Sequence, residues 1–68
     1  MQATAILTAA VEGGYTALNP ETGTVSQGET VEEALGNLRE AVALYLDEFP
    51  DTAFATPIVT TISIPEHA

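Results

Sequence analysis

The chain has 68 residues, and its ten acidic side chains against a single arginine give a formal net charge of −9. Because neutralising phosphates takes lysine and arginine, we expect no direct nucleic-acid binding. An acidic surface instead speeds encounter with a basic protein, although net charge also serves simply to keep small proteins dispersed. The sequence has no cysteine, which excludes disulfides and thiolate metal sites, and no apolar run near the ~20 residues of a membrane span.

Residues 1–68 are expected to form one domain with a marginal hydrophobic core. Domains of this size often need a staple, and without cysteine we expect that staple to be self-association into a dimer or tetramer. The N-terminus lacks the basic region of a secretory leader, and the absence of cysteine suits a reducing compartment. The sequence therefore predicts a cytoplasmic protein.

The N-terminal part of the chain predicts an antiparallel meander of three strands. Residues 3–11 alternate in a period of two, which is typical of a half-buried strand. Two further strands are expected at residues 15–18 and 24–27, after the turn sequences Glu-Gly-Gly and Asn-Pro-Glu-Thr-Gly. The apolar face of the first strand would carry Ala5, Leu7, Ala9 and Val11.

A helix is predicted to begin after Thr30, whose hydroxyl can accept from the Glu33 amide while the Glu33 carboxylate reaches back in a capping box. Pro50 should end it, because proline cannot continue helical hydrogen bonding. The apolar positions keep helical spacing and should face a core: Val31, Ala34, Leu35, Leu38, Val42, Tyr45, Leu46 and Phe49.

Residues 58–64, Ile-Val-Thr-Thr-Ile-Ser-Ile between two prolines, predict a fourth strand. The expected order is β-β-β-α-β, an α+β domain with one helix packed on one face of an antiparallel-rich sheet. The other face of that sheet would be open to solvent or to a weak docking partner. We expect it to be lined by Thr4, Ile6, Thr16, Leu18, Val59 and Thr61.

The sequence contains no arrangement that indicates catalysis. His67, the one histidine, follows a proline near the chain end, where a proton-transfer group is rarely held in place. Ser26 and Ser63 have no activating base nearby in sequence, and no phosphate-binding glycine loop is present. We therefore expect neither an enzyme nor a bound cofactor.

The acids of the predicted helix do not form a metal site. Glu33, Glu40 and Asp47 recur every seven residues on one face, but successive members lie roughly 10 Å apart, too far to share one cation. Leu44 lies among them, off the core stripe. It is either an ordinary exposed leucine or an apolar anchor for a second subunit or partner.

The run from Gly14 to Leu46 resembles the N-terminal domain of the HicB family of antitoxins. That family typically carries a Gly-Tyr pair, a Pro-Glu turn, a Val-Ser/Thr-Gln-Gly-Asp/Glu-Thr run and a helix with Glu-Glu-Ala, Asn-Leu-Arg/Lys-Glu-Ala and Tyr-Leu. The matching positions are Gly14-Tyr15, Pro20-Glu21, residues 25–30, residues 31–34, residues 37–41 and Tyr45-Leu46.

The resemblance implies a partial RNase H-like fold of β-β-β-α-β order and a role in neutralising HicA, a small basic mRNA-cleaving toxin. It implies no catalysis. Two departures stand out: the turn reads Pro-Glu-Thr-Gly-Thr, without the family's second proline and cysteine, and no C-terminal DNA-binding segment follows the predicted fourth strand. DNA autoregulation is therefore not expected of this chain alone.

From these observations the sequence predicts an antitoxin-like domain that masks the RNA-binding and active surface of a basic toxin. The expected contacts are Glu29, Glu33, Glu40 and Asp47, with Leu44 as an apolar anchor. A sheet edge that adds a strand from the partner is the alternative surface. The alternative function is a stand-alone oligomeric adaptor without a toxin, and a third is a degenerate nuclease that needs a divalent metal.

Overall fold

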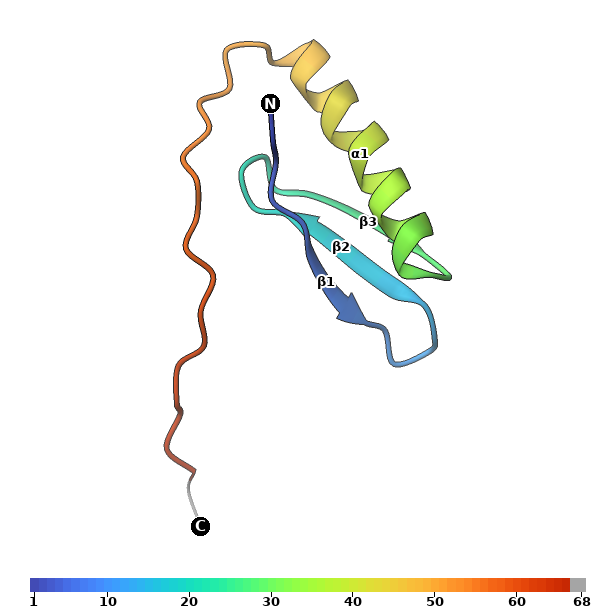
Figure 1. The fold of residues 1–68 in the computed structure, drawn as a ribbon, viewed down its shortest axis with the longest axis vertical. Helices are drawn as coiled ribbons and strands as arrows, with labels where there is room; N and C mark the ends of the chain where they lie inside the picture. The colour runs from blue at the N-terminus through green and yellow to red at the C-terminus, as the bar shows by residue number, and fades with distance from the viewer. Residues whose placement is uncertain (67–68) are drawn as a thin grey trace.

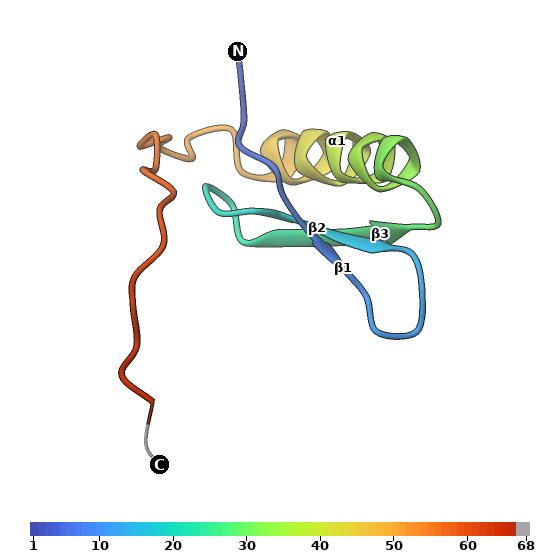
Figure 2. The same cartoon turned by 60° about the horizontal axis from the view of Figure 1, so that its bottom comes forward.

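The protein is an antiparallel sheet with one helix on one face, in a computed structural model that describes residues 1–66. The sheet order is β1-β2-β3, and α1 lies over β3 and β2 (Figure 1). Figure 2 shows the helix as a second layer above the sheet, with the opposite face uncovered. The predicted α+β class and meander are confirmed. The elements are β1 (Ile6–Ala9), β2 (Tyr15–Asn19), β3 (Thr24–Gly28) and α1 (Val31–Glu48).

β1 is shorter than the strand predicted at residues 3–11, because side chains and a turn occupy the backbone groups at its ends. The Thr4 amide donates to the Glu21 carboxylate at 2.9 Å, and the Thr4 carbonyl accepts from the Asn19 amide at 2.8 Å. Beyond the strand, Ala10 N–H donates to the Gly14 carbonyl at 3.0 Å and closes the hairpin. The local pattern was correct, but its outer residues serve the turns.

Two glycines bring the end of the sheet close to the helix. Gly14 has a φ of +76°, and a Cβ there would lie 2.7 Å from the Gly28 carbonyl oxygen. At Gly28 a Cβ would lie 2.5 Å from the backbone nitrogen of Ala34. Because neither neighbour is a flexible side chain, the missing Cβ atoms allow β2, β3 and the first turn of α1 to approach one another.

The core is small. Ala17, Ala34, Leu38 and Val42 are its buried apolar residues, and Leu7, Tyr15 and Leu46 pack against them. The cross-strand pair of Leu7 with Ala17 faces the helix, so its neighbours Ile6 and Leu18 face the open side, as the period of two predicted. Four buried apolar side chains among residues 1–66 are few for a domain, which agrees with the expectation of a marginal core.

The predicted fourth strand does not form. Residues 52–66 contain neither helix nor strand, and Figures 1 and 2 both show this part of the chain lying apart from the sheet after α1. We call residues 58–64 the isoleucine segment; Ile58 is 92% exposed, Ile62 79% and Ile64 70%. A strand requires a paired edge as well as an alternating sequence, and in this chain the pairing is missing. Val59 and Thr61 therefore do not line the open face.

Within residues 1–66, no helix combines the length and the apolar character that a bilayer crossing requires.

Candidate partner-binding surface

The helix carries an acidic face directed away from the sheet. We define the acidic face as Glu33, Glu40, Leu44 and Asp47 of α1; all four side chains are exposed, and Leu44 is 67% exposed. Residues seven apart in an α-helix differ by only about 20° in direction, so the three acids form one line, with Leu44 beside it. The line is about 21 Å long, since fourteen residues separate its ends.

The first acid of this line also stabilises the helix. The Glu33 amide donates to the Thr30 hydroxyl at 3.1 Å, and the Glu33 carboxylate accepts from the Glu29 amide at 2.9 Å. The predicted cap is confirmed in its first half; the returning bond reaches Glu29, one residue before the cap residue. Both the backbone amide and the carboxylate of Glu33 therefore serve the helix cap, as the capping box predicts. Glu33 is consequently less free than Glu40 or Asp47 to bind a partner.

The five predicted contact residues fall into two groups. Glu29 and Glu33 line a polar hollow of about 330 Å³ where the helix begins, whereas Glu40, Leu44 and Asp47 lie further along the exposed side of α1. A partner that contacts all five would have to cover most of the helix length. The other side chains and backbone of the hollow belong to Ala10, Gly13, Tyr15, Gln27 and Gly28.

Metal binding and nucleophilic catalysis find no support in the described part of the chain. Among residues 1–66 no group of three acidic or histidine side chains is arranged to hold a metal ion. The Ser26 hydroxyl donates to the Ala34 carbonyl at 3.0 Å and so connects β3 to the helix, and Ser63 is exposed in the isoleucine segment. His67 lies outside the described residues.

A second polar cluster, which sequence reasoning did not single out, holds the N-terminal residues against the β2–β3 turn. Asn19 is fully buried; its amide nitrogen donates to the Thr4 carbonyl and to the Glu21 carboxylate, and its side-chain oxygen accepts from the Thr22 amide at 2.9 Å. The Thr4 hydroxyl donates to the Glu21 carboxylate at 2.6 Å. The one signal in the sequence is the asparagine that opens the turn, and by itself it indicates only a turn.

The hydrogen bonds from Thr4, first from its hydroxyl and then from its amide, hold the pKa of Glu21 below its ordinary value. The amide of Asn19 adds to this effect, while partial desolvation opposes it. The ionised carboxylate is therefore the form that the fold prefers at this position.

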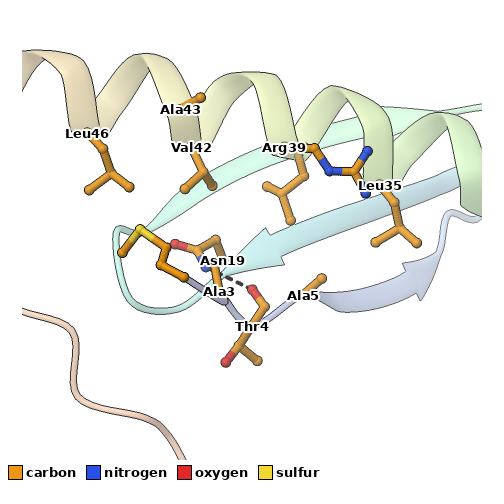
Figure 3. Close-up of a pocket in the computed structure, with 11 residues that line it drawn as sticks. Ala3, Thr4, Ala5, Asn19, Leu35, Arg39, Val42, Ala43 and Leu46 are labelled. Carbon is orange, nitrogen blue, oxygen red and sulfur yellow. Dashed lines mark hydrogen bonds between the residues drawn. The ribbon is translucent and has the colours of Figure 1, made fainter.

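An apolar groove lies between the helix and the residues that this cluster holds. Its volume is about 420 Å³, and Figure 3 shows side chains of α1 on one side and residues 3–5 on the other. Arg39 lies along the groove; it is the one arginine of the sequence, which has no lysine. The principal lining residues are Ala3, Ala5, Leu35, Arg39, Val42 and Leu46.

Comparisons with family models, with curated proteins and with solved structures find no match to this chain. The resemblance to HicB antitoxins therefore depends on the quoted residues between Gly14 and Leu46.

Proposed function

We propose that this protein is a HicB-like antitoxin domain that binds a basic HicA-type toxin and masks the surface with which the toxin binds and cleaves RNA. It acts in the cytoplasm as a binding protein without catalysis. Complementary charge brings the two proteins together, and the exposed helix then blocks the positive surface that would otherwise bind RNA phosphates.

The observation that carries this proposal is the acidic face. Within residues 1–66, the side chains of Glu40 and Asp47 make no hydrogen bond that supports the fold, and Leu44 is exposed beside them. The whole chain has a net charge of −9. Aligned carboxylates around one apolar side chain fit an interface with a central anchor and a charged rim. The resemblance supplies the class of the partner, a small basic ribonuclease.

A stand-alone oligomeric adaptor is the second candidate. It is favoured by the uncovered isoleucine segment and by a core of four buried apolar residues, both of which call for a further chain. Self-association and toxin binding are compatible, because the acidic face and the groove use different sides of α1.

Co-expression tests the function directly. If a short basic reading frame beside this gene is toxic alone, the present chain should restore growth when both are expressed. If the neighbouring reading frame stays toxic although the folded chain is expressed with it, the antitoxin proposal is refuted. If the neighbouring reading frame is not toxic when expressed alone, the adaptor is favoured.

Charge reversal tests the surface. The double change Glu40→Lys with Asp47→Lys should weaken binding of the purified toxin at least tenfold and reduce its dependence on salt, since two attractive charges become repulsive. Glu12→Lys is the control, because Glu12 is an exposed acid in the β1–β2 turn and not on α1, and Glu40→Lys alone is its matched counterpart on the helix, since both change the net charge by the same amount. Equal losses for Glu12→Lys and for the double variant would show that the acidic face has no special role.

A further inference from the structure

We propose that the isoleucine segment of one copy pairs with the free edge of β1 in a second copy, and that two such exchanges form a closed dimer. The segment has the residue types of a β-strand, and its large apolar side chains are unfavourable in contact with water. Ile58, Ile62 and Ile64 are 70–92% exposed. A neutral, β-prone run of this kind promotes aggregation unless a partner covers it.

The outer edge of β1 is the acceptor. Among the strands of residues 1–66, β1 pairs with β2 on one side and with no strand on the other. The edge of β3 is partly covered, because the Asn37 side chain donates to the Gln27 carbonyl at 2.8 Å. β1 also lies away from the part of the sheet that α1 covers (Figure 1). A strand added there would extend the sheet beside the apolar groove.

The isoleucine segment fits this position in length and in pattern. It has seven residues, the same number as residues 3–9, which are β1 and the three residues that lead into it, and seven residues span about 23 Å as a strand. In a period of two, Ile58, Ile62 and Ile64 share one face with Thr60. If this face is directed toward the helix, its isoleucines enter the groove between Ala5 and Leu35. The opposite face of the segment, which carries valine, threonine and serine, then continues the open side of the sheet.

Charge identifies the occupant as a second copy. Residues 52–65 carry no charged side chain, and neither do residues 1–11, whereas the ten acids lie elsewhere in the chain. Two copies with a net charge of −9 each can therefore meet at this edge without opposing carboxylates. A basic partner would gain nothing from these neutral surfaces and would bind the acidic face instead.

Reciprocity closes the assembly. Each copy has one strand to give and one edge to receive it, so a two-fold axis satisfies both at once and closes the assembly at two copies. Return of the segment to β1 of its own chain would satisfy the same edge, but the segment lies apart from its own sheet in both views (Figures 1 and 2). The dimer also enlarges a core of only four buried apolar residues.

Sedimentation of the full chain tests the exchange. The wild type should have twice the chain mass, and Ile62→Lys should have the mass of one chain while its circular dichroism retains the helix. Thr61→Lys is the matched control, because Thr61 lies on the other face of the segment, and it should remain dimeric. A wild type that sediments as a single chain, or an Ile62→Lys variant as dimeric as Thr61→Lys, would overturn the proposal.

A mixing experiment separates exchange between copies from return within one chain. Ala5→Arg should block the groove and give single chains, whereas Thr8→Arg on the open face should not. Ala5→Arg mixed with Ile62→Lys should form a heterodimer, because the intact segment of the first fits the intact groove of the second. Single chains after mixing would refute the exchange. Ile62→Lys should still bind the proposed toxin, so this test and that of the function fail independently.

Discussion

At the scale of single residues, one buried amide and one carboxylate decide where the sheet ends. The Glu21 carboxylate accepts hydrogen bonds from the amide and the hydroxyl of Thr4, and the Asn19 amide donates to the Thr4 carbonyl and to Glu21. A buried asparagine is costly unless its hydrogen bonds are made, and here donor and acceptor sides are both used. The cluster therefore holds Thr4 in place, and Ala3, Thr4 and Ala5 form one side of the groove.

Glu21→Gln should lower the melting temperature at neutral pH, because the charge-assisted bonds to Thr4 are lost. The pKa of Glu21 is lowered in the fold, so the stability it contributes is present above the ordinary pKa of about 4.5 and is lost as pH falls through the lower folded value. Thermal melts of both proteins across the acidic range should therefore converge at low pH. Glu12→Gln, an exposed control, should melt like the wild type; a Glu21→Gln deficit that persists unchanged in acid would contradict the assignment.

At the scale of elements, α1 has two sides with separate tasks. Ala34, Leu38 and Val42 are buried against β2 and β3, while Glu40 and Leu44 remain exposed. The helix begins where the Thr30 hydroxyl accepts from the Glu33 amide and ends at Glu48, one residue before Phe49 and two before Pro50. Packing of one stripe, more than helix propensity, stabilises such an element.

Leu38→Ala should lower the free energy of unfolding by about 2–5 kcal/mol, because Leu38 is only 4% exposed and its removal opens the core beneath the helix. Leu44→Ala is the matched control on the exposed side and should change that free energy by less than about 0.5 kcal/mol. Urea unfolding followed by circular dichroism measures both. A loss below about 1 kcal/mol at Leu38 would mean that the helix does not depend on this contact.

At the scale of the whole molecule, charge and apolar surface are separated along the chain. The acids lie in the turns, on α1 and near both ends of the connection after it, and the first strand and the isoleucine segment are neutral. A charge of −9 on 68 residues repels itself in the compact state, and screening should relieve that repulsion. The same screening should weaken attraction to a basic partner.

Raising sodium chloride from about 0.01 M to about 0.5 M should therefore increase the melting temperature of the wild type, since the Debye length falls from about 30 Å to below 10 Å. Association with the proposed toxin should slow over the same range. Scanning calorimetry and stopped-flow mixing measure the two effects. A melting temperature that falls with salt would show that attractive charge pairs, and not self-repulsion, dominate this surface.

The sequence alone determined the meander, through the period of two in residues 3–11 and the glycine turns. It also determined the helix and its buried stripe, through the apolar spacing from Val31 to Leu46. These features are local, because strand alternation, turn chemistry and helix capping depend on neighbours within a few positions. The exposed positions of Glu40, Leu44 and Asp47 followed from the same helical geometry. The function proposed for them rests on the resemblance and on charge.

What only the tertiary structure decided concerns residues far apart in the chain. Thr4 meets Glu21 across 17 positions, which shortens β1 and builds the groove, and no local pattern specifies that contact. The isoleucine segment has the sequence of a strand in every local respect, yet it lies unpaired. A strand is completed by the edge beside it, so its alternation determined what residues 58–64 can become, and the availability of an edge determines whether they do.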